Sequence, residues 1–335
     1  MKLVTYLKDG QDQLGIVVDG HIYAMDALHS DLPNTMSMFL NFWDDIMPLA
    51  KAVEQRIKDR LTKNPVAESF ADAEIIAPVP HPTSCRDGYA FRQHVAAARR
   101  NRKLDMIAEF DQYPVFYFTN HNSIQGPGNI ICMPDHFKKL DFELEASIVI
   151  NKPGRNIKAA DADEYIAGLM IMNDISARTL QMEEMLLNLG PAKGKDFATV
   201  IGPMLVTLDE LEQYEVPCKE NHIGKSWNLN MKCWVNGKQV SEGNLSDMDW
   251  TFAEIIERCS YGVNLMPGDV IGSGTVGTGC FLELNGTGLL NNSDFKPQWL
   301  EEGDVVDMEI YGLGKLTNTI IKDESDFSIL ALKKI

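Results

Sequence analysis

The chain has 335 residues, 44% of them apolar, so it can bury a substantial core, and its length suggests about two domains. Its 31 basic and 48 acidic residues give a net charge of −17, which repels nucleic-acid phosphates and anionic lipid headgroups. We therefore expect neither nucleic acid nor membrane as a partner.

The amino-terminal residues predict a small α+β domain. Residues 1–30 alternate like short antiparallel strands, with turns at Asp9-Gly10 and Asp19-Gly20, and residues 35–63 predict a helix. The proline-rich stretch 75–82 predicts an extended connector. We place a domain boundary there, which gives a small amino-terminal domain (1–75) and a larger domain (76–335).

Two absences bear on location. The amino terminus lacks the apolar core of a signal peptide, and no segment approaches the ~20 apolar residues of a membrane span, so we expect a cytoplasmic protein. The six cysteines are scattered without a C-x-x-C pair. Reduced, mostly buried thiols are therefore favoured over a disulfide framework or a zinc site.

Residues 89–101 predict a helix that carries a possible catalytic pair. Asp87 and His94 are seven positions apart, which on one helix would put them on the same face, about 10 Å apart. A histidine there is either a satisfied core residue or, if a carboxylate orients it, a general base. The basic cluster at 99–103 complements the helix dipole or forms a site for a substrate carboxylate.

Strands are predicted near 114–119, 129–133, 142–150 and 165–172. Glu143 and Glu145 are two apart in the third of these, so they project from one face and repel each other. The pair is either a solvated acidic edge or half of an all-oxygen site for Mg²⁺ or Ca²⁺. Asp174, after the fourth strand, is either a helix cap or a further ligand.

A predicted helix near 177–188 places Arg178 and Gln181 on one face, and Lys195 follows in a glycine-containing segment. Cations and an amide beside a carboxylate cluster suit a reaction that builds negative charge on oxygen. The sequence therefore predicts an anion-stabilising group next to the acidic residues.

The remaining sequence predicts mostly strands, hence a β-rich α+β fold with a mixed or antiparallel sheet. Gly272–Gly277 satisfies G-x-G-x-x-G, but residues 280–284 predict a strand where a dinucleotide fold needs a helix, so we do not expect nucleotide binding. We interpret this loop as a flexible rim in which Thr275 offers a hydroxyl to a ligand. Glu283, within an apolar run, needs a partner such as a histidine.

Together these motifs resemble the fumarylacetoacetate hydrolase family over residues 78–335. The resemblance rests on the following segments: Asp87 with His94, Leu-Asp-Phe-Glu-Leu-Glu at 140–145, Asn-Asp-Ile-Ser-Ala-Arg at 173–178 with Gln181, Gly-Lys-Asp-Phe-Ala-Thr at 194–199, Gly-Pro at 202–203, and Gly-Asp-Val-Ile-Gly-Ser-Gly-Thr-Val at 268–276. Residues 1–75 resemble the family's amino-terminal domain only loosely.

The resemblance implies a mixed β-sheet or β-roll catalytic domain, usually in a homodimer, that binds a divalent cation, Mg²⁺, Ca²⁺ or Mn²⁺. It implies metal ligation by Asp87, Glu143, Glu145 and Asp174, with Lys195 and Thr199 lining the metal site. It also implies His94 as the base oriented by Glu283, charge stabilisation by Arg178, Gln181 and Lys195, and substrate contacts from Tyr89, Tyr117, Gln181 and Thr275. Two departures leave the substrate open, a short stretch between Thr275 and Glu283, and Met185 in place of an expected tyrosine.

The implied activity is hydrolytic cleavage of a C–C bond in a fumarylacetoacetate-like 1,3-diketo acid, giving fumarate and acetoacetate in tyrosine and phenylalanine breakdown. Rivals of the same fold are an acylpyruvate hydrolase, or a decarboxylase, isomerase or hydratase of a 2-oxo acid. A non-catalytic metal-binding protein is the rival of another class. His94 with Glu283 favours hydrolysis, and the set of Arg178, Gln181 and Lys195 disfavours a silent protein.

Overall fold

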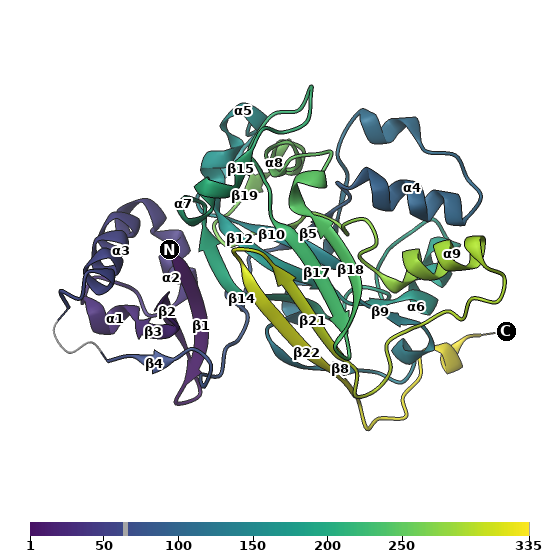
Figure 1. Ribbon diagram of the computed structural model, residues 1–335, viewed down its shortest axis with the longest axis horizontal. Helices are drawn as coiled ribbons and strands as arrows, with labels where there is room; N and C mark the ends of the chain where they lie inside the picture. The colour runs from purple at the N-terminus through teal and green to yellow at the C-terminus, as the bar shows by residue number, and fades with distance from the viewer. Residues whose placement is uncertain (63–65, 335) are drawn as a thin grey trace.

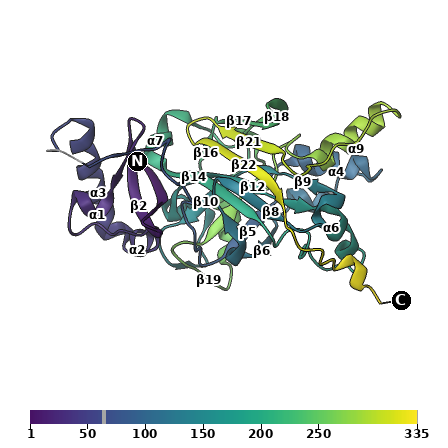
Figure 2. The same cartoon turned by 90° about the horizontal axis from the view of Figure 1, so that it is seen from below.

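Two mixed β-sheets packed against each other form the centre of the protein in the computed structural model, which describes residues 1–62 and 66–334 (Figure 1). Strand β14 of the larger sheet contacts β22 of the smaller one, and one apolar cluster draws side chains from both. Helices cover the outside of this core (Figures 1 and 2). The β-rich α+β fold expected from the sequence is confirmed.

The larger sheet has 11 strands and is mostly antiparallel, with β20–β5 and β14–β7 as parallel pairs. Its order is β4 (Glu68–Ser69), β3 (His21–Ala24), β2 (Gln11–Val18), β1 (Lys2–Lys8), β14 (Thr199–Thr207), β12 (Ile166–Asp174), β10 (Leu144–Ile150), β20 (Val270–Gly272), β5 (Cys85–Gly88) and β6 (Phe116–Thr119), with β7 (Ile124–Gln125) beside β14. Strands β10 and β12 are buried along their whole length, which explains why they are apolar runs rather than alternating sequences.

The smaller sheet has five strands, in the order β18 (Lys238–Asn244), β17 (Asn230–Val235), β21 (Val305–Ile310), β22 (Gly314–Lys322) and β8 (Gly128–Cys132). Three two-stranded pairs complete the β structure: β11 (Gly154–Arg155) with β19 (Asn264–Leu265), β13 (Ser176–Ala177) with β9 (Leu140–Asp141), and β15 (Glu215–Val216) with β16 (Ser226–Trp227).

The helices are α1 (Met25–Leu28), α2 (Met36–Asn41), α3 (Trp43–Lys58), α4 (Arg92–Asn101), α5 (Ala159–Ala162), α6 (Arg178–Met185), α7 (Leu208–Leu211), α8 (Phe252–Ser260) and α9 (Phe281–Asn291). Short 3-10 helices are η1 (Ala108–Asp111), η2 (His121–Ser123), η3 (His136–Lys138), η4 (Asp163–Tyr165), η5 (Glu212–Tyr214), η6 (Leu245–Asp247) and η7 (Leu330–Leu332). Helices α4 and α9 lie side by side at one end of the molecule (Figure 1).

The amino-terminal strands form as the sequence predicts. Asp9 and Asp19 have positive φ, as do the glycines that follow them, which is the backbone geometry of tight hairpin turns. The helix expected over 35–63 is instead two helices, α2 and α3, that meet at Phe42, and residue 63 lies outside the described residues. Strand β1 pairs with β14, so the larger sheet continues into this region, while a domain division near residue 75 stays a prediction.

The carboxyl-terminal half contains more helix than expected. Thr251 and Glu254 form a reciprocal capping box at the start of α8. The strand predicted over 280–284 is wrong, because these residues begin α9. Residues 280–284 are an apolar run broken only by Glu283, which resembles a buried strand. The backbone N–H groups of Phe281 and Leu282, however, donate to the Asp141 carboxylate, which starts the helix from outside the local sequence.

The helix predicted over 89–101 begins only at Arg92, and Asp87 lies on strand β5. The inference that Asp87 and His94 share a helix face is therefore wrong. The Ala90 N–H donates to the Ser273 carbonyl oxygen at 3.0 Å, which holds the chain extended between the strand and the helix. This extended segment between β5 and α4 positions His94 near the carboxylates.

His136 provides a test of the packing at η3. Its ring stacks on Phe197, with centroids 3.9 Å apart, and burial lowers its pKa to about 4. In the unfolded chain the histidine has a pKa near 6.5. Between about pH 6.5 and pH 4 the unfolded state therefore binds more protons than the folded state, and the free energy of unfolding decreases as the pH is lowered. We expect the parent to lose about 1–2 kcal/mol more unfolding free energy than His136→Asn between pH 7 and pH 5 in urea titrations. Equal losses would contradict a neutral folded imidazole.

Among residues 1–62 and 66–334, none of the helices has both the length and the apolar composition to span a bilayer. All six cysteines have free thiols, and five of the six are buried, as expected.

Candidate active site and metal centre

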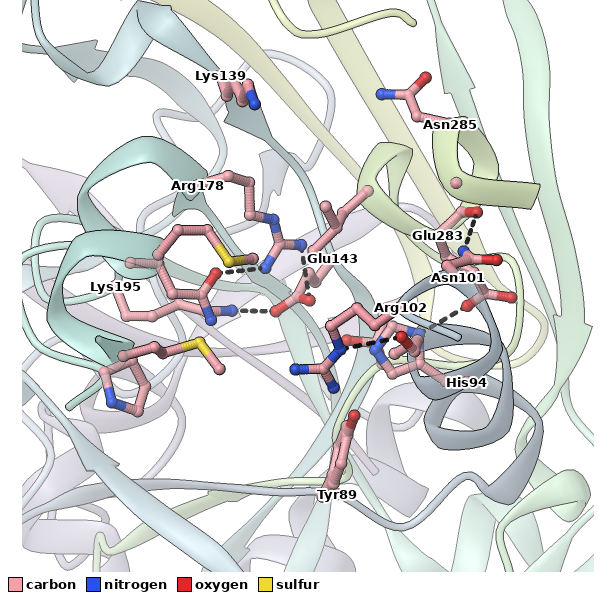
Figure 3. A pocket seen from close by; sticks show the side chains of 18 of the residues that line it. Tyr89, His94, Asn101, Arg102, Lys139, Glu143, Arg178, Lys195, Glu283 and Asn285 are labelled. Atoms are coloured by element: carbon pink, nitrogen blue, oxygen red, sulfur yellow. Dashed lines mark hydrogen bonds and ion pairs between the residues drawn. The ribbon is translucent and has the colours of Figure 1, made fainter. Parts of the chain in front are cut away.

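A cavity of about 630 Å³ opens between helices α4, α6 and α9 at one end of the larger sheet (Figure 3). It brings together most of the residues singled out in the sequence. The predicted site residues that line it are Asp87, Tyr89, His94, Tyr117, Glu143, Arg178, Gln181, Lys195, Thr275 and Glu283. Glu145, Asp174 and Thr199 lie behind this lining, within the sheet.

Three strands of the larger sheet hold the acidic residues: β12 and β10 are neighbours, and β20 separates β10 from β5. Asp87 is on β5, Glu145 on β10 and Asp174 at the end of β12, and one carboxylate oxygen from each lies within 4.8 Å of the others. Glu143 lies just before β10, because this strand begins at Leu144 rather than at the expected Phe142. All four carboxylates are buried, which excludes a solvated acidic edge.

The glycine-containing loop after β20 supports this cluster. A Cβ on Gly272 would lie 2.4 Å from Asp87 Oδ1, so only glycine leaves room for that carboxylate. The Gly274 N–H donates to Asp87 Oδ1 at 3.0 Å, and the Thr275 hydroxyl donates to Glu145 Oε1 at 3.2 Å. These residues are buried, so the expectation of a flexible rim is wrong and the loop is part of the carboxylate cradle.

The electrostatics of the cradle favour an added positive charge. Burial and the neighbouring Asp174 raise the pKa of Asp87 to about 7. Burial, Asp87 and Glu143 raise the pKa of Glu145 well above its usual range. Burial also raises the pKa of Asp174, although Lys195 opposes this shift.

Two buried oxygens indicate where a cation would bind. Glu145 Oε2 and Asp174 Oδ1 have no hydrogen-bond partner among the described residues. Such atoms are costly to bury unless a ligand pairs with them, and an all-oxygen donor set suits a hard divalent cation. Asp87, Glu145 and Asp174 therefore fit a Mg²⁺, Ca²⁺ or Mn²⁺ ion.

Glu143 connects this cradle to the cationic residues. It accepts a hydrogen bond from Arg178 Nη2 at 2.8 Å and pairs with Lys195, whose ammonium also lies 2.7 Å from Asp174 Oδ2. Burial alone would raise the pKa of Glu143, but Arg178 and Lys195 lower it below its usual range. Arg178 Nη1 donates to Gln181 Oε1 at 3.0 Å, so the predicted shared face of α6 is confirmed.

His94 and Glu283 meet across the opposite wall of the cavity (Figure 3). His94 Nδ1 lies 2.6 Å from Glu283 Oε2, and both side chains are buried. The Thr278 N–H holds the other carboxylate oxygen of Glu283 at 3.0 Å. With Nδ1 bound to Glu283, Nε2 is the ring nitrogen left to exchange a proton with a ligand.

Of the three remaining predicted residues, two lie beside the carboxylates and one lies beside His94. Tyr117, opposite Asp87 in the β5–β6 register, donates its phenol proton to Asp174. Thr199, opposite Asp174 in the β12–β14 register, lies 3.4 Å from the Thr119 hydroxyl. Tyr89 lines the cavity with its ring edge-on to His94. Thus Tyr117 and Thr199 adjoin the carboxylates, and Tyr89 packs against the imidazole ring of His94, with ring centroids 5.8 Å apart.

The basic cluster at 99–103 divides between the two roles considered for it. Arg99 and Arg100 lie in the last turn of α4, where they complement the helix dipole. Arg102 follows the helix and lines the cavity beside His94 and Tyr89 (Figure 3). No ion pair of Arg102 is present among the described residues. One member of the cluster can therefore meet a substrate anion.

The position of Glu283 also shows whether the G-x-G-x-x-G motif could bind a nucleotide. A helix does follow this motif, so the reason given against nucleotide binding was wrong. That helix, however, has the Glu283 carboxylate in its first turn, bonded to the Thr278 N–H. A phosphate at this helix start would meet a carboxylate instead of free N–H donors, so the site is unsuited to a nucleotide.

Asp141 is a structural centre of the site that the sequence reasoning missed. This fully buried carboxylate accepts hydrogen bonds from the N–H groups of Phe281 (2.7 Å) and Leu282 (3.0 Å) and from Arg178 Nε (2.8 Å). It thereby fixes Arg178 and the first turn of α9, which carries Glu283. An aspartate inside an apolar run was the available signal.

We expect Asp141→Asn to destabilise the protein by about 3–5 kcal/mol, because the substitution leaves buried donors facing an amide. It should also lower kcat by about 10–100-fold, because Arg178 and α9 lose their shared anchor. Asp269→Asn is the matched control, since Asp269 is also buried and pairs with Arg86 at 3.4 Å, outside the cavity. Urea titration and kcat per folded enzyme check both effects. A control variant that loses as much kcat would contradict the anchoring role.

The chain is similar in sequence to several known proteins. The sequence profile described as "Fumarylacetoacetate (FAA) hydrolase C-terminal" matches residues 83–321. A mitochondrial oxaloacetate tautomerase of Xenopus laevis is 30% identical over 311 residues, which cover 90% of this chain and 83% of that protein. A fumarylacetoacetase of Oryza sativa is 36% identical over 199 residues, covering 50% of this chain and 46% of that protein.

Solved structures share the fold. A fumarylacetoacetate hydrolase from Exiguobacterium antarcticum superposes with a TM-score of 0.68 at 23% identity, covering 96% of this chain and 100% of that one. A maleylpyruvate hydrolase from Sphingobium sp. SYK-6, in complex with manganese(II) and pyruvate, superposes with a TM-score of 0.69 at 18% identity, covering 97% and 100%. At these identities the likeness establishes the architecture.

Proposed function

Because the chain belongs to the fumarylacetoacetate hydrolase family, we propose that it hydrolyses a C–C bond in a fumarylacetoacetate-like 1,3-diketo acid. The observation that carries this proposal is the buried contact of 2.6 Å between His94 Nδ1 and Glu283 Oε2 at the wall of the acidic cavity. A carboxylate-oriented imidazole is what the activation of water requires.

The reaction adds water across the bond between a carbonyl carbon and the adjacent carbon. His94 Nε2 takes a proton from water, and the hydroxide oxygen bonds to the acyl carbonyl carbon. The C–C bond then breaks, and its electron pair forms the enolate of the departing oxo acid. A proton added to the enolate carbon completes the products, a carboxylic acid and a methyl ketone acid.

The chain's cations serve the departing enolate. Arg178 and Lys195 line the cavity on the side facing His94, and a ring nitrogen of His94 lies within 4.8 Å of a Glu143 oxygen that these cations hold (Figure 3). Positive groups that are already in place stabilise negative charge on oxygen without reorganising. A divalent cation held by Asp87, Glu145 and Asp174 would supply Lewis acidity for the two keto oxygens.

The second candidate is keto–enol tautomerisation of oxaloacetate, which breaks no C–C bond. It is supported by the 30% identity with the Xenopus laevis tautomerase over 90% of this chain. An imidazole base beside enolate-stabilising cations would serve either reaction, so the substrate decides between them. Decarboxylases, isomerases and hydratases of 2-oxo acids remain further alternatives of the same fold.

A substrate panel distinguishes these candidates. Purified protein with Mg²⁺ or Mn²⁺ is offered fumarylacetoacetate, acetylpyruvate and enol-oxaloacetate, and the products are identified by NMR. Formation of two acids from a diketo acid supports hydrolysis. Conversion of oxaloacetate between its tautomers, with every diketo acid left intact, would replace the proposal by the tautomerase. Light scattering at micromolar concentration tests the homodimer that we also propose.

A further inference from the structure

The walls of the cavity change character along two helices. Lining residues of α6 follow the spacing i, i+3, i+4, i+7, from Arg178 and Gln181 to Met182 and Met185. Seven helical residues rise about 10 Å, so Met185 lies about 10 Å farther along the axis than Arg178. One wall therefore begins with a cation and ends with thioethers.

Helix α9 repeats this change on the facing wall. Glu283 stands in its first turn, and Leu289 lines the cavity farther along the helix. Pro297 and Trp299, from the segment after α9, continue the lining. The cavity thus has a charged inner half and an outer half walled by methionine, leucine, proline and tryptophan.

The cavity as a whole is larger than a small oxo acid requires. At about 30 Å³ per water molecule, the cavity of about 630 Å³ has room for about 20 waters. Met185 is 41% exposed and Leu289 46% exposed, so the outer walls present apolar surface to water. Apolar surface that lines a concave site gains most from an apolar ligand.

The charged residues of the cavity determine which end of the substrate lies in the inner half. Arg102 lies beside His94 and Tyr89, where it suits the carboxylate of the diketo acid head (Figure 3). Lys139 lies beside the inner end of α6, because its carbonyl oxygen accepts from the Arg178 N–H at 2.9 Å, and its Nζ lies 5.9 Å from the centroid of the Trp299 ring. The Asn285 amide is engaged with the backbone of Gln298. Met182, Met185, Leu289 and Pro297 carry no charge, so these walls offer nothing to a second carboxylate.

We infer that the substrate is a 1,3-diketo acid whose acyl group is an extended apolar chain rather than a chain ending in a carboxylate. This inference rests on the proposed hydrolysis of a 1,3-diketo acid, and it replaces the fumaryl group of fumarylacetoacetate, which ends in a carboxylate, by an apolar chain. The diketo acid head occupies the charged inner half, and the alkyl chain lies between Met182 and Met185 on one side and Leu289 and Trp299 on the other. Longer chains then bind more tightly until the cavity is filled.

The test compares two series of acylpyruvates of equal chain length, one ending in a methyl group and one in a carboxylate. Burial of a methylene is worth a factor of about two to four in affinity. We expect kcat/KM of the methyl series to rise by this factor per carbon from acetyl to about octanoyl, and to exceed that of the carboxylate series. A flat methyl series, or a carboxylate series that is better by tenfold, would overturn the inference.

Two neighbouring leucines give a matched pair of variants. Leu289 lines the cavity and is 46% exposed, whereas Leu290 is 48% exposed and lies outside the lining. Leu289→Glu should abolish the gain with chain length, and Leu290→Glu should retain it. Equal behaviour of the two variants, both shown to be folded by circular dichroism, would also overturn the inference.

Calorimetry on His94→Ala separates this inference from the proposed function. The Kd of each acylpyruvate is measured without turnover, so chain-length dependence can be tested even if the parent cleaves none of them. Cleavage of acetylpyruvate with Kd values independent of chain length overturns the inference alone. Affinity that rises with chain length in a protein that never cleaves a diketo acid overturns the proposed hydrolysis alone.

Discussion

Replacing His94 with alanine is expected to lower kcat for diketo acid cleavage by about 10²–10⁴-fold, the range for a lost general base. The structure leaves Nε2 as the ring nitrogen able to take the proton, because Nδ1 is held by Glu283. The affinity for the divalent cation should change little, since the three carboxylates that cluster within 4.8 Å do not include this residue. Steady-state kinetics and metal titration check both parts.

Glu283→Gln should give a smaller loss in the same direction, because the base remains but its orientation and charge compensation are lost. The double variant should be no slower than His94→Ala alone, since the two side chains act as one unit.

His222 offers the matched control, because its Nδ1 lies 2.9 Å from Glu254 Oε2 in a comparable pair away from the cavity. His222→Ala should keep the parental kcat. Parental cleavage rates in both His94→Ala and Glu283→Gln would refute the dyad.

Chelation of the divalent cation should lower activity by about 10³-fold or more, because a Lewis acid contributes several kcal/mol to such a transition state. Adding Mg²⁺, Ca²⁺ or Mn²⁺ back should restore it. At a metal concentration of 100 times Kd, the cation should also stabilise the folded protein by about 2.7 kcal/mol, measured as a rise in Tm. Full activity in protein shown by elemental analysis to be metal-free would exclude the metal site.

Glu145→Gln isolates the carboxylate contribution. Glu145 has no cationic partner, and its Oε2 lacks a hydrogen bond among the described residues. We expect this variant to lose the metal-dependent rise in Tm while its metal-free form is at least as stable as the metal-free parent, because one of several repelling charges is gone. Asp135 is the control: its buried carboxylate accepts hydrogen bonds from Ser328 and Leu330 outside the cavity. Asp135→Asn should keep the metal-dependent rise in Tm.

The parts of the fold that could be predicted depend on local signals. Asp9-Gly10 and Asp19-Gly20 specify tight turns through their own backbone preferences, and the apolar runs around 144–150 and 166–174 specify buried strands. The predictions failed where a residue distant in sequence determines the local secondary structure. Helix α9 begins because Asp141, 140 residues earlier, accepts the Phe281 N–H, and no local pattern encodes this.

The candidate site shows the same division. Motif spacing identified the titratable residues, because carboxylates and cations in apolar runs are conspicuous. It could not reveal that Asp87 lies on a strand, or that Asp141 joins Arg178 to α9, since both follow from strand order rather than from neighbours in sequence. The apolar outer half of the cavity was also invisible, because its walls come from helices far apart in the chain.

The order of strands in the larger sheet has a consequence for how the protein is made. Asp87 accepts a hydrogen bond from the Gly274 N–H, 187 residues later, and β5 pairs with β20 across a similar interval. During synthesis, Asp87 and Glu145 therefore leave the ribosome long before the loop that holds them. Non-local pairings of this kind slow folding. We expect the nascent chain to be unable to hold a cation at the candidate site until the loop after β20 has emerged, so that cation capture becomes a late step of maturation.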